Sequence, residues 1–420
     1  MRAEAAELVS RYRSVRARTE SLCAPLSPED QGAQSMPDAS PAKWHLAHTT
    51  WFFETFVLAR SEGGDGRVFD ASFAFLFNSY YEAVGERVAR ARRGLLTRPS
   101  LEVVRAYRAD VDARLTRALA DGRLDDEALA TLELGLHHEQ QHQELVLTDV
   151  KHLLGTHPLL PAYRSGLARD TRSAPPAPAW VSFPGGVHSI GARDAATAGF
   201  AFDNERPHHQ VLLPPFSLAT RPVCNRDVLE FIAAGAYHDA RLWLSDGWHT
   251  LRSEGWEAPL YWQRRDGGFF AYDLGGVRAV DPDEPACHLS YYEADALARF
   301  AGARLPTEAE WEVAAAGLSA DQGHFADDER LHPRASQAAG LTQLFGDVWE
   351  WTASAYAPYP GFRPLAGALG EYNGKFMCSQ LVLRGGSCFT PRGHVRGSYR
   401  NFFPPSTRWQ MTGVRFARDG

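Results

Sequence analysis

The chain has 420 residues, which at about 100–200 residues per domain predicts two or three domains. Its apolar fraction of 44% is typical of a globular protein with a substantial core. The 44 basic and 51 acidic residues give a formal net charge of −7, so no overall basic field favours nucleic acid. The sequence has no apolar run of the roughly 18 residues that a membrane span needs. Its charged N-terminal segment also lacks the apolar stretch of a signal peptide.

Five cysteines are scattered along the chain, and none of them forms a Cys-x-x-Cys pair. This distribution argues against a disulfide framework and against zinc held by thiolates, and it is typical of a reducing compartment. We therefore expect a cytoplasmic protein without nucleic-acid or membrane partners. The sequence does not determine its oligomeric state.

Residues 1–155 carry helical periodicity, with polar or proline residues at the expected helix starts. The expected helices are residues 4–20, Ser40 to about Leu58, one that opens at Ser100, and one from about Asp125 to Gly155. Gly155 would supply a left-handed cap, and four such helices predict an antiparallel bundle.

A proline-rich linker is expected at 156–179, and a loop-rich domain with helices and short strands at 180–420. The expected helices in this domain are Asn225–Ala234, Tyr292–Gly302 and Glu308–Ala316. A strand and turn are expected at Val181–Val187, and strands at Leu381–Leu383 and Val414–Ala417. The fold class is therefore α+β in two domains.

The last bundle helix carries two histidines four residues apart, His138 and His142. Side chains at this spacing lie on one face of a helix and can share one metal ion, whereas His137 points elsewhere. A bare pair of this kind is common by chance, and a helix with spare polar histidines is the alternative. Glu139 and Glu144 are expected around the site or on the surface rather than as ligands.

A third histidine, His48, lies on an aromatic stripe with Trp44, Trp51 and Phe52, while His45 falls off that stripe. A single inward histidine is more often a satisfied core residue. Facing an inward pair on another helix, however, it matches the way bundle cores build metal sites. Three imidazoles suit zinc, iron, copper or nickel, and their spacing does not choose among these metals.

Two motifs resemble a known family. The stretch Ser35 to Glu54 (SMPDASPAKWHLAHTTWFFE) and the stretch Leu136 to Glu144 (LHHEQQHQE) resemble the metal motifs of the sulfoxide synthases of ergothioneine biosynthesis. That family folds this region as a DinB-like four-helix bundle. The resemblance implies iron(II) held by His48, His138 and His142, and a contact between Gln141 and the histidine-derived substrate.

The second half of the chain resembles the formylglycine-generating-enzyme, or sulfatase-modifying, domain, which has a C-type-lectin-like fold. The matching stretches are Arg304–Glu312 (RLPTEAEWE), Gly346–Trp351 (GDVWEW), Leu383–Ser387 (LRGGS) and Gly413–Phe416 (GVRF). Two further stretches, Gly370–Met377 and Ser398–Pro404, look like substrate-pocket segments of the family's non-mycobacterial branch. Together the resemblances cover nearly the whole chain.

By resemblance, the enzyme joins a thiol sulfur to the imidazole of hercynine with O2 and forms a sulfoxide. Cysteine and γ-glutamylcysteine both fit as the thiol. The family branch also implies that Tyr80 or Tyr81 donates a proton or hydrogen during the reaction. The further candidates for substrate contacts are Arg87 and Arg90 for the thiol's carboxylate, and Asn401 and Phe402 for the trimethylammonium.

Two other functions remain open from the sequence. One is a metal-dependent thiol transferase of the DinB-like type, which would need neither a redox metal nor a lectin-like domain. The other is a non-catalytic lectin-like binding module, which would leave the metal motifs without a purpose. Formylglycine formation is disfavoured because the second half has no closely spaced cysteine pair. An ovothiol-type synthase is disfavoured because no residues remain for a methyltransferase domain.

Overall fold

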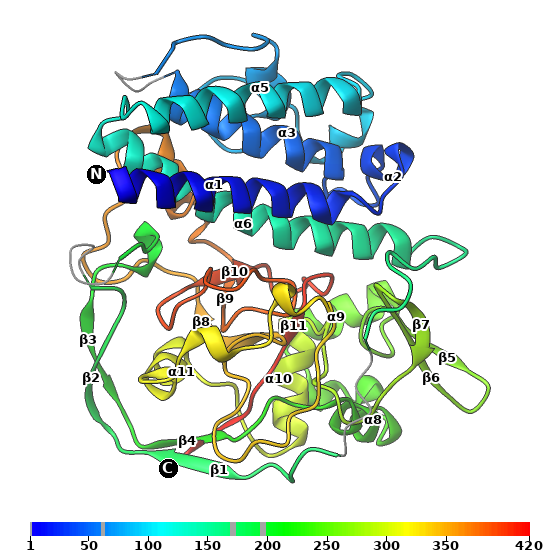
Figure 1. Ribbon diagram of the computed structural model, residues 1–420. Coiled ribbons are helices and arrows are strands. Elements are labelled where there is room, and N and C mark those ends of the chain that lie inside the picture. The colour runs from blue at the N-terminus through cyan, green and yellow to red at the C-terminus, as the bar shows by residue number, and fades with distance from the viewer. Residues whose placement is uncertain (1, 60–63, 169–173, 194–198) are drawn as a thin grey trace. The chain divides into compact units, whose positions relative to one another are not determined.

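The computed structural model describes residues 2–59, 64–168, 174–193 and 199–420 (Figure 1). The chain divides into two compact units. The helical unit contains Met1–Tyr163 and Leu365–Tyr372, and the mixed unit contains Arg164–Pro364 and Asn373–Gly420. The predicted α+β class, with helices first and a mixed second half, is confirmed.

The helical unit is built around long helices that lie side by side (Figure 1). Its helices are α1 (Arg2–Cys23), α2 (Pro28–Gly32), α3 (Ala42–Phe52), the π-helix η1 (Phe53–Leu58), α4 (Phe73–Phe77), the short η2 (Arg90–Leu95), α5 (Leu101–Ala120) and α6 (Asp126–Gly155). α1, α3, α5 and α6 correspond to the four expected bundle helices.

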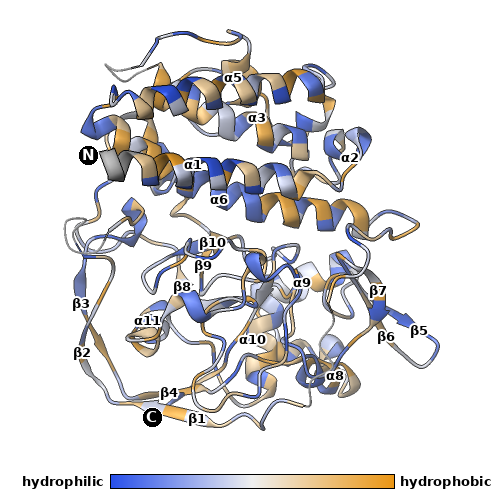
Figure 2. Cartoon of the chain, in the orientation of Figure 1, coloured by the Kyte–Doolittle hydropathy of each residue, from blue (hydrophilic) through white to orange (hydrophobic). Residues whose placement is uncertain are grey.

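Local sequence explains where the two longest later helices begin. The Ser100 hydroxyl accepts a hydrogen bond from the amide of Val103, and the Asp125 carboxylate accepts one from the amide of Ala128. These side chains satisfy amides that the first helical turn leaves without partners. Hydrophobic and hydrophilic residues alternate along the long helices (Figure 2). Among the described residues, no helix is long and apolar enough to cross a membrane.

Two expected helix ends are wrong by a residue. Pro41, not Ser40, is the N-cap of α3, because the Pro41 carbonyl accepts the first helical hydrogen bonds, from the amides of Trp44 and His45 at 2.8 and 3.2 Å. Gly155 is the last residue of α6, and the residue that caps it, Thr156, has a φ of −102°, so the cap is not left-handed. The expected second helix also changes to π geometry at Phe53.

The π-helical turn packs closely against α6 at Gly135. A Cβ atom at this position would lie 2.5 Å from the Phe53 ring and 3.0 Å from the Phe52 ring. Only glycine therefore lets α6 approach these aromatic residues. Single π-helical turns are frequent at functional sites, so the segment after α3 is a candidate part of such a site.

The mixed unit is dominated by loops and short elements. Its described α-helices are α8 (Asn225–Ala233), α9 (Ser245–Glu254), α10 (Tyr291–Phe300) and α11 (Glu308–Ala315). Its strands are β1 (Trp180–Phe183), β2 (Gly186–Ile190), β3 (His209–Leu213), β4 (Phe216–Ala219), β5 (Trp262–Arg265), β6 (Gly268–Asp273), β7 (Gly276–Ala279), β8 (Trp349–Ala355), β9 (Leu381–Arg384), β10 (Asn401–Phe403), β11 (Thr412–Gly413) and β12 (Ala417–Asp419).

The strands pair in the orders β1-β4-β12, β10-β9-β8-β11, β2-β3 and β5-β6-β7. The expected strand at Val414–Ala417 is wrong, because most of it connects β11 in one sheet to β12 in another. At the centre of the unit, Glu350 is fully buried and accepts hydrogen bonds from Arg415 and from the Trp311 indole. This paired carboxylate fixes β8 against the surrounding core.

Candidate metal centre

Three histidines converge inside the helical unit. His48 comes from α3, and His138 and His142 come from successive turns of α6. Their candidate ligand atoms all lie within 4.8 Å of one another, and all three side chains are buried. The ring centroids are 4.6 Å apart for His138 and His142, 4.7 Å for His48 and His142, and 5.0 Å for His48 and His138. The structure thus brings together the three residues that the sequence motifs single out.

The three imidazoles are neutral at neutral pH. Burial is the main cause that lowers the pKa of each ring, and it lowers that of His138 to about 4. The pKa values of His48 and His142 also lie well below the ordinary value. A neutral imidazole offers one lone pair, so each ring is in the protonation state that a metal ligand requires.

The hydrogen bonds of the rings determine which nitrogen faces the centre. His48 donates from Nδ1 to the Phe77 carbonyl at 2.6 Å, which leaves the Nε2 lone pair free. That Nε2 lies 3.2 Å from His138 Nε2. Two nitrogens each about 2.1 Å from one ion are roughly 3.0–3.4 Å apart at ordinary bond angles. The spacing of this pair and the neutral donor set therefore fit a bound divalent transition metal.

Aromatic side chains surround the centre. The Trp44 ring stacks on His48 with centroids 4.5 Å apart and planes 13° apart, and Trp51 stacks on its other side at 5.7 Å. Phe52 lies 4.7 Å from His138. These rings hold the imidazoles in place and keep water from their faces, which strengthens every electrostatic interaction at the site.

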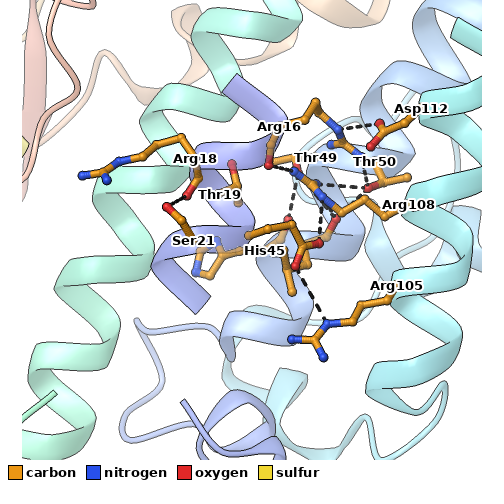
Figure 3. Close-up of polar contacts among 12 residues, drawn as sticks. Arg16, Arg18, Thr19, Ser21, His45, Thr49, Thr50, Arg105, Arg108 and Asp112 are labelled. Atoms are coloured by element: carbon orange, nitrogen blue, oxygen red, sulfur yellow. Dashed lines mark hydrogen bonds and ion pairs between the residues drawn. The ribbon is translucent and has the colours of Figure 1, made fainter. Parts of the chain in front are cut away.

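The carboxylate beside His138 in sequence belongs to a different network. Glu139 is fully buried, and it accepts hydrogen bonds from Arg16, Arg108 and Thr19 at 2.8, 2.5 and 2.6 Å. Figure 3 shows Arg16 and Arg108 extending from their helices into this network. Glu139 is therefore neither a ligand nor a surface residue.

Replacement of Glu139 by alanine should destabilise the protein by about 3–5 kcal/mol, because Arg16 and Arg108 lose their shared buried counter-charge. Each guanidinium keeps only a partly exposed partner, Asp112 for Arg16 and Glu20 for Arg108. Burial alone would raise the pKa of Glu139, but Arg108 and Arg16 outweigh it and lower the pKa from 4.5 to about 2. The wild type should therefore lose stability as the pH falls from about 4.5 toward 2, and the variant should show a weaker dependence. Urea unfolding across this range measures both effects.

A matched control is Glu133→Ala on the same helix, because Glu133 pairs with Arg11 at a surface where both side chains are 40% exposed. This pair should contribute at most about 1 kcal/mol. Equal destabilisation by the two substitutions would contradict the role assigned to the buried glutamate.

The prediction that His45 lies off the inward face is wrong. Its side chain is 2% exposed, its Nδ1 lies 2.8 Å from His142 Nδ1, and its Nε2 lies 3.0 Å from an Asp149 oxygen. All residues of α3 except Lys43 are buried, so the helix has no polar face for His45 to occupy. His137 is also buried, with its Nε2 3.0 Å from Arg11, and is not among the clustered histidines.

The predicted tyrosine pair lies in the loop after α4, and its two members face different surroundings. Tyr81 is 3% exposed and packs against Phe56 at 5.0 Å and Trp51 at 5.9 Å. Tyr80 is half-buried, and its hydroxyl accepts a hydrogen bond from Arg90. The Trp51 ring lies between Tyr81 and His48 and contacts both. Tyr80 instead contacts Arg90.

A buried asparagine fixes the backbone of this loop. Asn78 donates from its side-chain amide to the carbonyls of Tyr81 and Gly85 at 2.9 and 3.1 Å, and its Oδ1 accepts from the Tyr81 amide at 3.1 Å. The preceding residue, Phe77, supplies the carbonyl that binds His48. The adjacent residues Phe77 and Asn78 therefore connect the position of Tyr81 to that of His48.

A segment remote in sequence completes this part of the helical unit. Glu371 accepts hydrogen bonds from the amides of Glu82 and Ala83 at 2.9 and 3.0 Å. The Tyr372 ring lies 5.7 Å from the Tyr80 ring. The sequence suggests Tyr372 only as part of a substrate-pocket segment, and gives no signal that the segment packs on the tyrosine loop.

The remaining predicted substrate contacts lie in several places. Arg87 forms an ion pair with Glu82, Arg90 binds the Tyr80 hydroxyl, and Gln141 is half-buried next to His142 on α6. In the mixed unit, Phe402 on β10 stacks on Tyr356 with centroids 4.0 Å apart, and Asn401 accepts a hydrogen bond from the Phe402 amide.

Comparison with known proteins identifies both units. Residues 11–146 match the DinB superfamily, and residues 166–339 and 334–420 match the sulfatase-modifying factor enzyme 1-like domain. A DinB-type bundle with a buried histidine centre, followed by this domain, defines the class of protein. The alignment with a formylglycine-generating enzyme of Streptomyces coelicolor is 30% identical and covers 57% of this chain and 88% of that one.

Relatives that share both units identify the family more closely. The chain is 33% identical to hercynine oxygenase of Mycolicibacterium smegmatis over 92% of each chain. It is also 33% identical to hercynine oxygenase of Mycobacterium tuberculosis, over 91% of this chain and 92% of that one. The chain therefore belongs to the hercynine oxygenase family.

Proposed function

We propose that the chain is an iron(II)- and O2-dependent sulfoxide synthase, which forms a carbon–sulfur bond between hercynine and a thiol in ergothioneine biosynthesis. One observation carries this proposal. The chain has a centre of three buried, neutral histidines within a sequence that is 33% identical to a hercynine oxygenase over 92% of its length. A fission yeast relative, named ergothioneine biosynthesis protein 1, is 26% identical over 52% of this chain and 28% of its own.

Iron suits this chemistry better than zinc. Three neutral imidazoles accept zinc, iron, copper or nickel, but zinc has no redox chemistry with which to use O2. Bound iron would act as a Lewis acid toward the thiol and supply the electron transfer that O2 requires. The proposal therefore rejects the zinc-type thiol transferase as the function of this chain.

Tyr81 is the proposed proton donor of the tyrosine pair. Burial raises the pKa of Tyr81, so the phenol keeps its proton at neutral pH. A neutral phenol can donate a proton or hydrogen without adding a buried charge. Tyr80 is proposed to assist this proton donation, and Arg90 holds its ring in place by a hydrogen bond to the hydroxyl.

Other side chains of this chain are proposed to bind the substrates. Gln141 would hydrogen-bond hercynine, and the guanidinium groups of Arg87 and Arg90 would bind the carboxylate of the thiol. The trimethylammonium group has no N–H to donate and prefers aromatic faces, which Phe402 offers beside Asn401 on β10. A cytoplasmic location belongs to the same proposal, because all five cysteines are free thiols.

The direct test is anaerobic reconstitution of the full chain with Fe(II), followed by hercynine, a thiol and O2, and mass analysis of the product. A sulfoxide that contains both substrates supports the proposal. Stoichiometric iron binding with no coupled product from either cysteine or γ-glutamylcysteine would refute it. Full activity with zinc in place of iron would instead favour a thiol transferase.

Hercynine should be used at least about tenfold more efficiently than histidine, measured as kcat/KM. A pocket shaped for trimethylammonium leaves the donors of a primary ammonium without partners, and each buried unpaired donor costs about 1–3 kcal/mol. Competition between the two substrates in one reaction measures the ratio directly. Equal efficiencies would remove the trimethylammonium pocket and point to an ovothiol-like substrate.

A further inference from the structure

One of the three histidines is connected to a buried carboxylate through a second imidazole. His142 Nδ1 lies 2.8 Å from His45 Nδ1, and His45 Nε2 lies 3.0 Å from Asp149 Oδ2. His45 is 2% exposed and Asp149 is 8% exposed, so water competes little for these hydrogen bonds. This series of hydrogen bonds connects α6 to α3, through His142 and His45, and returns to α6 at Asp149.

The proton positions in this chain follow from the requirements of a metal ligand. A metal on His142 Nε2 places the remaining ring proton on Nδ1, which then donates to the lone pair of His45 Nδ1. His45 must then carry its own proton on Nε2, from which it donates to Asp149. Each of the two imidazoles thus has one assigned tautomer, and the series of hydrogen bonds ends on the Asp149 carboxyl group.

The three histidines differ in what binds their outer nitrogen. His48 donates to a neutral backbone carbonyl at 2.6 Å. The Nδ1 of His138 is buried and has no hydrogen-bond partner among the described residues. Within the described part of the chain, His142 is the one of the three that is connected to a carboxylate, through His45. The His142 imidazole is therefore the strongest electron donor of the three, because a negatively charged hydrogen-bond acceptor raises the basicity of the ring.

The carboxylate is itself fixed by a wider buried network. Asp149 Oδ2 also accepts the Ser40 amide at 2.8 Å. The Ser40 hydroxyl accepts from Arg93 at 2.9 Å, and Arg93 donates to the Ser79 hydroxyl at 3.0 Å. Ser79 directly precedes the tyrosine pair. The same network therefore joins the His142 side of the centre to the loop that carries Tyr80 and Tyr81.

We propose that His45 and Asp149 are positioning residues, which hold His142 in one tautomer and orientation and make it the strongest electron donor at the metal. This inference rests on the proposed metal centre and extends it to two residues that the motifs do not assign. Loss of either residue should weaken metal binding. Loss of the carboxylate's charge should also raise the reduction potential of bound iron, because Fe(III) needs donated electron density more than Fe(II) does.

The first test measures Co(II) affinity by competition with a chelator in the full chain. Asp149→Asn keeps the side-chain shape but removes its charge, and His45→Phe keeps a ring but removes both nitrogens. Each should raise the Kd for Co(II) by about 10–100-fold, the usual effect of such partners. His45→Gln retains an amide that can accept from one neighbour and donate to the other, and should recover part of the affinity.

His137→Gln is the matched control, because it changes another buried histidine of α6 that contacts Arg11 instead. This variant should bind Co(II) within about twofold of the wild type. Melting temperatures of the metal-free proteins check that each variant folds. If His45→Phe does not fold, Asp149→Asn and the reduction potential still decide the question.

The second test measures the Fe(III)/Fe(II) midpoint potential of the wild type and of Asp149→Asn under anaerobic conditions. A higher potential in the variant supports the proposal, because a merely structural carboxylate would leave the potential unchanged. Unchanged Co(II) affinity and unchanged potential would overturn it, even if the enzyme turns over hercynine. Conversely, the expected shifts in a protein that forms no sulfoxide would support the positioning role and refute the proposed function. A wild type without stoichiometric metal binding would overturn both.

Discussion

Replacement of His138 by alanine should abolish stoichiometric iron binding and lower sulfoxide formation on the order of 10³-fold or more, since a metal ion contributes several kcal/mol to such reactions. His138 adjoins both other rings, with its Nε2 3.2 Å from His48 Nε2 and its ring centroid 4.6 Å from that of His142. Its loss removes one of three ligands and opens a cavity beside Phe52. Metal analysis after reconstitution and a product assay measure the two effects separately.

The same result is expected for His48→Ala and His142→Ala, while His137→Ala should retain iron. The motifs alone also predict that His45→Ala retains iron, but the hydrogen bond between His142 and His45 changes that expectation to weaker binding. Full iron occupancy in His48→Ala would contradict the ligand assignment. Loss of iron in His137→Ala would indicate that general destabilisation of α6 explains the losses.

The parts of the centre that the sequence predicts are those governed by local periodicity. The spacing of four residues places His138 and His142 on one face of α6, and the ring contacts confirm that they adjoin. The aromatic stripe on α3 places His48 opposite them. Periodicity failed for His45 because it assumes one outward face, whereas α3 is surrounded on all sides. For a helix in the middle of a bundle, periodicity alone does not predict which residues are buried.

The parts that the sequence does not predict depend on contacts between distant residues. Glu371 accepts hydrogen bonds from the amides of Glu82 and Ala83, almost three hundred positions away in sequence. No local sequence pattern predicts this pairing. In the mixed unit, the apolar stretch at Val414–Ala417 has the composition of a strand. Its residues instead cross from the β8 sheet to the β4 sheet, and strand pairing is decided by the partners available on each side.

Replacement of Tyr81 by phenylalanine should change which product forms, and not only how fast it forms. The substitution removes the hydroxyl and keeps the ring that packs against Trp51 and Phe56, so folding and iron binding should survive. Without a proton donor at the reacting atoms, the thiol remains the group that is easiest to oxidise. The variant should therefore convert the thiol mainly to its sulfinic acid, with little carbon–sulfur bond formation.

Tyr80→Phe is the matched comparison, because it removes the neighbouring hydroxyl, which binds Arg90 at the other side of the loop. We expect it to keep more of the wild-type product ratio than Tyr81→Phe, since the Tyr81 ring contacts Trp51, which stacks on His48, whereas the Tyr80 ring packs against Tyr372. The measurement is the ratio of sulfoxide to sulfinic acid for each variant and for the double variant. If all three keep the wild-type ratio, both tyrosines are packing residues, and Tyr372, which lies beside Tyr80, becomes the next donor to test.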